Sequence, residues 1–126
     1  MTKKTIIAAL LLLTSIALNA AIINPNASIV NPLNTQWFYD GDQIRVDADI
    51  SANLGQCRVS FIVDGVEADH TTMNRPTYLF TVHFPWTATA STDPNQLLTV
   101  HVLQVKVVDS LGYSATSKAI SVLVYH

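Results

Sequence analysis

From residue 43 onward, apolar and polar side chains alternate along the chain with a period of two. The alternation is clearest in five segments: residues 43–50, 58–63, 77–84, 103–107 and 120–125. Successive side chains of a β-strand point to opposite faces, so each segment predicts a strand with one apolar face. After residue 20, no segment shows the 3.6-residue period of an amphipathic helix. The pattern therefore predicts an all-β protein.

Turn-forming residues separate these segments. Asp40-Gly41-Asp42 precedes the first strong strand, and Asp64-Gly65 predicts a tight hairpin because glycine accepts a positive φ. Residues 28–30 lie between two Asn-Pro pairs and fit a short edge strand. The alternation changes phase within residues 98–103, which predicts either a β-bulge or a loop that runs to about His101.

The pattern amounts to about seven short strands in one domain over residues 21–126, without a helix. Short strands with one apolar row each bury those rows most simply by packing two antiparallel sheets face to face. The sequence therefore predicts a two-layer antiparallel β-sandwich.

Several sequence pieces also occur in a familiar order along the chain. These pieces are Ile29–Pro32, Gly41–Ala48, Val59–Gly65, Pro76–Phe80 with Trp86, and Leu103–Gly112. Together they resemble the bacterial immunoglobulin-like domain family of secreted and cell-surface proteins. The resemblance implies an immunoglobulin-like sandwich and a role in binding, spacing or adhesion, since that family shares no catalytic residues. Tyr113, where the family usually has Asn, and a longer segment after Trp86 depart from the pattern only in loops.

Residues 1–20 have the features of a secretory signal peptide. Lys3 and Lys4 precede an apolar run over residues 6–13, and small residues follow at Ala20 and Ala21. A transmembrane anchor needs about 20 apolar residues, and this run is interrupted by Thr14-Ser15. We therefore predict cleavage after Ala20, no stable membrane span in the mature chain, and a secreted, periplasmic or cell-surface location.

The composition narrows the class of protein further. The 126 residues carry 7 Lys and Arg against 9 Asp and Glu, a formal charge of −2, with 49% hydrophobic residues and a mean hydropathy of +0.30. Cleavage after Ala20 leaves 106 residues with 5 cations and 9 anions, a charge of −4. A nucleic-acid partner is excluded because so few cations cannot form a strong basic face.

Cys57 is the only cysteine, so no disulfide within the chain is expected. Two interpretations stay open. Cys57 is either a small buried hydrophobe on a strand or the site of a disulfide to a second chain.

Trp37-Phe38-Tyr39 is the most unusual local feature of the sequence. Three consecutive aromatic residues on an extended segment cannot all face one side. One interpretation is an aromatic surface that stacks on a sugar or grips a protein; the other is a cap over the open end of the sandwich. These three residues are the predicted binding site.

No catalytic or metal-binding constellation stands out. The histidines lack ligand spacing, with His83 expected on an outward strand row, His70 in a polar loop and His126 at the end of the chain. The aspartates at turns could gather calcium, but aspartate beside glycine is more simply explained by backbone hydrogen bonds within the turn. Glu67, the only glutamate, is expected in a loop, and no Gly-x-Ser-x-Gly or glycine-rich phosphate loop occurs.

The last candidate feature is the apolar run 119–125, which is core if it forms an inner strand and a pairing surface if it forms an edge.

The sequence as a whole predicts an exported, non-catalytic immunoglobulin-like binding module without metal or cofactor. Its partner is a protein or a glycan, and the oligomeric state is left open. The alternatives are a structural subunit of a surface assembly and a secreted enzyme inhibitor.

Overall fold

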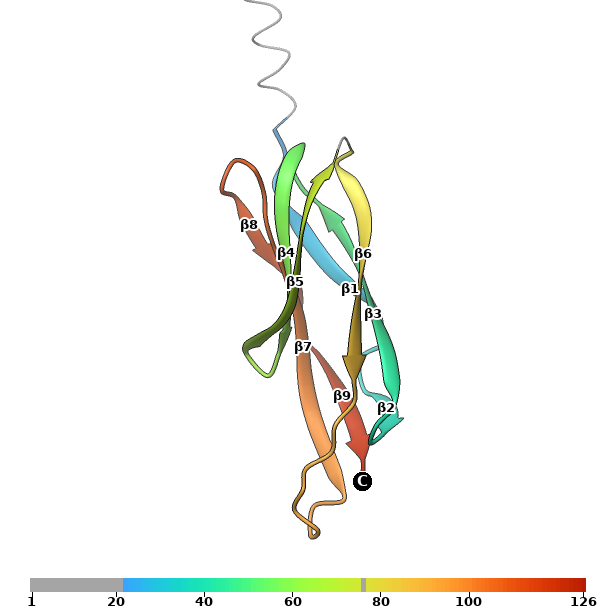
Figure 1. Cartoon of the computed structure of the whole chain (residues 1–126). Helices are drawn as coiled ribbons and strands as arrows, with labels where there is room; N and C mark the ends of the chain where they lie inside the picture. The colour runs from blue at the N-terminus through green and yellow to red at the C-terminus, as the bar shows by residue number, and fades with distance from the viewer. Residues whose placement is uncertain (1–21, 76) are drawn as a thin grey trace, which may run out of the picture.

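A computed structural model describes residues 22–75 and 77–126, and the predicted signal peptide at residues 1–20 lies outside the described residues. The described chain is all β and packs two sheets into a sandwich (Figure 1). Its strands are β1 (Asn26–Asn31), β2 (Gln36–Tyr39), β3 (Gln43–Ser51), β4 (Gly55–Val63), β5 (Val66–Arg75), β6 (Leu79–Thr87), β7 (Leu98–Val108), β8 (Ser114–Thr116) and β9 (Ile120–Tyr125). The predicted all-β sandwich is confirmed.

The two sheets differ in size. The smaller sheet has the order β1-β3-β6, and the larger has the order β2-β9-β7-β4-β5, with β8 paired to β7. The described residues form nine strands, more than expected, because the short strands β2 and β8 and the long strand β5 were not recognised from the sequence. The pairing is antiparallel except between β2 and β9, which run parallel. The run 120–125 is thus an inner strand, between β2 and β7.

The core fills the space between the two sheets. It is formed by the inward rows of both sheets, among them Val46 and Ile50 of β3, Phe61 of β4, Phe84 of β6 and Val122 of β9. Cys57 belongs to this core and is 3% exposed, as its interpretation as a small buried hydrophobe requires. A disulfide to a second chain would need this thiol to reach the surface.

The Asp64-Gly65 hairpin is confirmed, and the segment after it is a strand where a loop was expected. Asp64 and Gly65 have φ values of 52° and 82°, the backbone that a two-residue hairpin of the I′ type requires. Strand β5 then pairs with β4 along its length, so Glu67 and His70 lie on a strand. The loop prediction was wrong because the polar residues of β5 hide an edge strand that lacks an apolar row.

Strand β7 also differs from its prediction. It runs without interruption from Leu98 to Val108, and its pairing with β9 shows neither a bulge nor a loop. The inward row continues from Val105 and Leu103 into the half-buried His101 and Thr99, while Val100 and Val102 face outward. The change of phase in the sequence therefore marks apolar residues on the outer face.

No helix in the described residues is long and apolar enough to cross a membrane.

Candidate interaction surface

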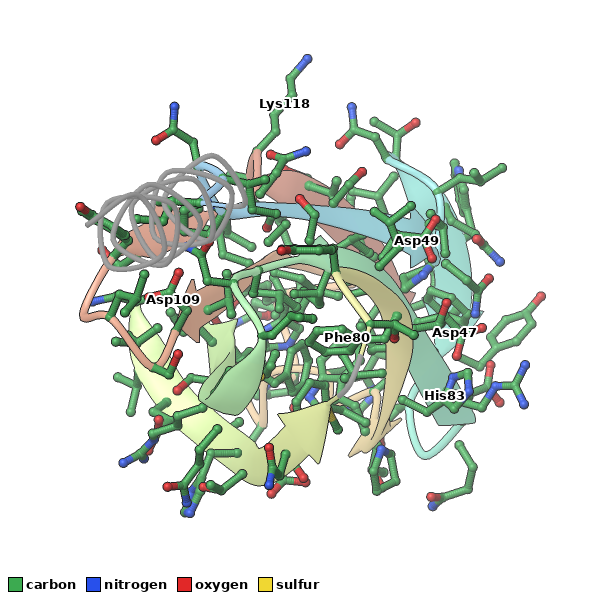
Figure 2. All side chains as sticks on the ribbon, turned by 90° about the horizontal axis from the view of Figure 1, so that it is seen from above. Asp47, Asp49, Phe80, His83, Asp109 and Lys118 are labelled. Carbon is green, nitrogen blue, oxygen red and sulfur yellow. The ribbon has the colours of Figure 1, made fainter. Side chains whose placement is uncertain are left out.

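The outer face of the smaller sheet is mostly polar, apart from the exposed Leu79, and is linked across its strands by hydrogen bonds. The Asp47 carboxylate lies 2.5 Å from His83 Nδ1, and the Thr81 hydroxyl donates to Asp49 at 3.0 Å. Figure 2 shows Asp47, Asp49 and His83 together on this side of the sandwich. His83 is on the outward row, as predicted. This face has the chemistry of an ordinary solvated sheet surface.

The outer face of the larger sheet is different over its lower half in Figure 1, where β2, β9 and the first part of β7 lie side by side. Its outward side chains form what we call the apolar face: Trp37 and Tyr39 of β2, Leu123 and Tyr125 of β9, and Leu98, Val100 and Val102 of β7. Trp37 is 60%, Tyr39 72% and Val100 50% exposed. No charged side chain stands among these seven residues.

The strand register makes these side chains neighbours. Trp37 lies opposite Leu123, which in turn lies opposite Val100. Tyr39 likewise lies opposite Tyr125, which lies opposite Leu98. Residues opposite each other on adjacent strands have Cβ atoms about 5 Å apart, so the two rows form one continuous apolar surface.

The predicted site at Trp37, Phe38 and Tyr39 is divided between two environments. Trp37 and Tyr39 belong to the apolar face, whereas Phe38 is half-buried and packs against the core. The Trp37 ring stacks on Tyr125, with ring centroids 4.4 Å apart and an interplanar angle of 14°. These four residues line a shallow cavity of about 200 Å³. Of the two interpretations, exposed surface and cap, the first therefore fits Trp37 and Tyr39 and the second fits Phe38.

The free edge of β2 is partly closed by its own turn. The Tyr39 N–H donates to the Asp42 carboxylate at 2.8 Å, and the Tyr39 carbonyl accepts the Asp42 N–H at 3.0 Å. These contacts occupy backbone groups that another strand would need in order to pair here. These contacts therefore oppose the addition of another strand at this end of the sheet.

The turn aspartates accept backbone hydrogen bonds: Asp93 does so within its own turn, as predicted, whereas Asp40 and Asp64 accept from segments distant in the chain. Asp40 accepts from Ala90 N–H, Asp64 from Val102 N–H and Asp93 from Asn95 N–H. Within the described residues, no group of three or more His, Cys, Asp and Glu side chains is placed to hold a metal ion.

One histidine and one carboxylate form a close pair that the sequence did not single out. His101 Nδ1 lies 2.6 Å from Asp64 Oδ2, and His101 Nε2 lies 2.6 Å from the Thr89 carbonyl oxygen. The Thr89 hydroxyl is farther away, at 3.5 Å from the same ring nitrogen. Both ring nitrogens face acceptors, so neither is left for a general base that activates a nucleophile. The pair ties the β4–β5 turn to the segment after β6.

Asp109 is a buried carboxylate that organises the opposite end of the sandwich. It accepts from Asn53 Nδ2 at 2.6 Å and from the N–H groups of Leu111 and Tyr113 at 3.0 Å. Burial alone raises the pKa of Asp109, but these hydrogen bonds to its charged form outweigh burial and hold the pKa below the ordinary 3.8. Asn53 also bonds both backbone groups of Ile23, so this cluster is a structural clamp.

Comparisons with known proteins agree with the fold. The chain is similar to a solved structure of the fibronectin(III)-like modules of CbhA from Clostridium thermocellum, with a TM-score of 0.54 and 21% sequence identity. The match covers 82% of this chain and 47% of that chain, so this chain spans about half the length of that structure. No protein-family model and no curated protein matches the chain. The likeness shows a fibronectin(III)-like sandwich. This fold supports the immunoglobulin-like fold that the sequence resemblance implied.

Sequence reasoning assigned two of the seven residues of the apolar face, Trp37 and Tyr39, to a binding site. It treated the run 119–125 as an inner or an edge strand and did not join Leu123 or Tyr125 to Trp37. The signal for Val100 and Val102 was the phase change itself, since an apolar residue out of phase with its strand's inner row faces solvent.

Proposed function

We propose that the protein is an exported, non-catalytic immunoglobulin-like module that binds a partner through its apolar face. The supporting observation is the contrast between the two outer faces of one sandwich. One carries hydrogen-bonded polar pairs, and the other presents seven apolar side chains without a charge, of which Trp37, Tyr39, Val100 and Val102 are exposed. Contiguous apolar patches on a soluble domain mark interaction sites more often than they arise by chance.

The chemistry of the apolar face favours a protein partner. The cores of protein interfaces are enriched in aromatic residues, depleted of charge and surrounded by a polar rim. The apolar face has three aromatic and four aliphatic side chains, and Asp40 and Asp42 lie just beyond Tyr39. A glycan partner is favoured by one feature, the exposed ring of Trp37 beside a shallow aromatic cavity.

A binding experiment tests this function through the two exposed rings. We expect Trp37→Ala and Tyr39→Ala each to weaken partner binding at least about tenfold, because truncating a central aromatic anchor commonly costs about 2 kcal/mol. The immobilised mature protein is incubated with envelope extract and, separately, with a glycan array. Retention is compared between the wild type and the two variants.

Val66→Ala is the matched control, since Val66 is 69% exposed but pairs with Val63, which pairs with the inward Leu103, so its side chain lies on the opposite side of the larger sheet from the apolar face. Unchanged melting temperatures show that the variants fold. A partner retained equally by the wild type and both aromatic variants would overturn the proposal. A stoichiometric envelope protein would favour the assembly subunit, and a captured enzyme that loses activity would favour the inhibitor.

Export is tested by the mass of the mature protein. We expect the intact mass of protein recovered outside the cytoplasm to correspond to a chain that begins at Ala21, because residues 1–20 have the pattern of a cleaved signal. Leu12→Asp should leave the uncleaved precursor inside the cell, since it places a charge in the apolar run. An exported protein that retains residues 1–20 would contradict this prediction.

A further inference from the structure

The apolar face is large enough to form most of one side of a protein interface. Trp37 and Tyr39 alone expose roughly 260 Å² if a fully exposed aromatic side chain presents about 200 Å². The largest apolar patch of a typical monomer covers about 300–600 Å². The outward sides of the other five residues bring the apolar face to the upper part of this range. With its polar rim, it approaches the roughly 800 Å² that each partner buries in a standard stable complex.

Acidic side chains gather at one end of this face, whereas at the other end Lys106 stands with two carboxylates, Asp64 and Glu67, that bond to His101 and Arg58. At one end, Asp40 and Asp42 follow Tyr39 in the turn between β2 and β3, and Asp93 lies in the loop before β7. At the other end, the outward row of β7 continues past Val102 to Gln104 and Lys106. Arg58, on the neighbouring strand β4, is bound by both carboxylate oxygens of Glu67 at 2.9 Å, so Lys106 is the cation available there.

We propose that the apolar face packs against the same face of a second copy of this chain, with the strands of the two copies antiparallel. This inference rests on the proposed function, because it names the partner of the same surface. A two-fold dimer uses one patch on both subunits, and a charge-free patch opposes no like charges when it meets itself. Two sheets packed face to face lie about 10 Å apart with interdigitated side chains.

The distribution of charge selects the direction of the two-fold axis. An axis parallel to the strands brings the acidic ends of both copies together, so that Asp40 and Asp42 oppose their own copies. An axis perpendicular to the strands places the acidic end of each copy beside the Lys106 end of the other. The second arrangement is electrostatically favourable. The hydrogen bonds between Tyr39 and Asp42 also leave face-to-face packing, rather than pairing of β2 edges, as the mode of contact.

Analytical ultracentrifugation of the mature protein, from nanomolar to high micromolar concentration, tests the dimer. We expect a concentration-dependent shift from monomer to dimer. Val100→Lys should raise the dimer Kd at least about tenfold, because it places a charge within the interface, in the row that Val100 forms with Leu123 and Trp37. Val66→Lys, an equal change at an exposed valine outside the face, should leave Kd unchanged. If Val100→Lys loses the near-ultraviolet circular dichroism of the wild type, Val102→Lys takes its place.

The arrangement is tested by a second matched pair. Lys106→Glu should raise Kd several-fold and Lys118→Glu should not, since Lys118 lies beside β1 in a groove lined also by Asn26 and Thr116. Figure 2 shows Lys118 projecting away from the sandwich. Equal effects of the two reversals would overturn the antiparallel arrangement.

Two results would overturn the dimer: a wild type that stays monomeric at every concentration, or a Val100→Lys variant that dimerises like the wild type. A monomeric wild type that still captures an envelope protein or glycan in a Trp37-dependent way would remove the dimer and leave the proposed function standing. A monomer without Trp37-dependent binding would remove both.

Discussion

Replacing Phe61 with alanine is expected to lower the free energy of unfolding by about 4 kcal/mol. Phe61 of β4 is fully buried and stacks on Phe84 of β6, with ring centroids 5.6 Å apart and an interplanar angle of 16°. The pair joins the two sheets through the middle of the core, and the truncation leaves a cavity that the surrounding strands cannot close. Since a domain of this size has a total stability of about 5–15 kcal/mol, the variant loses a large share of it.

Urea denaturation followed by tryptophan fluorescence measures this loss. Phe61→Leu is the matched control, because a smaller apolar side chain that largely fills the same space should cost less than about 1.5 kcal/mol. A double-mutant cycle with Phe84→Ala should reveal a coupling of about 0.5–1.5 kcal/mol between the rings. A loss below about 1 kcal/mol for Phe61→Ala would show that the two sheets are not held together at this pair.

Replacing Asp109 with asparagine is expected to cost about 2–3 kcal/mol, the second largest effect. The substitution keeps the shape of the side chain but removes the charge that accepts from Leu111 and Tyr113. It also turns an amide N–H₂ toward the N–H₂ group of Asn53, so that two donors face each other inside the clamp. The loss is measured by urea denaturation at neutral pH, with Asp93→Asn as the control at an exposed turn.

The same variant tests the pH dependence of stability. The folded pKa of Asp109 lies below its unfolded value, so its contribution to stability is present above the unfolded pKa of about 4 and is lost as the pH falls through the folded pKa. The wild type should therefore lose stability below about pH 4 more steeply than Asp109→Asn. Asp64, whose pKa is also lowered, supplies acid sensitivity common to both proteins. Parallel acid profiles for the two proteins would contradict the role of Asp109.

The fold was predictable where local chemistry determines structure. The apolar rows of β3, β4 and β6 follow directly from the period-two pattern, and Asp64-Gly65 could be assigned to a hairpin because few residue pairs accept two positive φ values. Strand β5 was missed since an exposed edge strand needs no apolar row to be stable once β4 hydrogen-bonds to it. The parallel pairing of β2 with β9 joins segments more than 80 residues apart in the chain, and nothing local signals it.

For the candidate surface too, some features could be predicted from the sequence and others depend on the tertiary structure. The sequence by itself determined that Trp37, Phe38 and Tyr39 could not all face one side, because neighbouring side chains on a strand point to opposite sides. Only the tertiary structure decided that Trp37 stacks on Tyr125 and that Leu123 stands between Trp37 and Val100. The physical reason is that alternation tells which residues of one strand share a face, whereas the order of strands in a sheet is chosen by long-range packing. The apolar face exists because β2 became the neighbour of β9 and β7, which lie in a distant part of the chain.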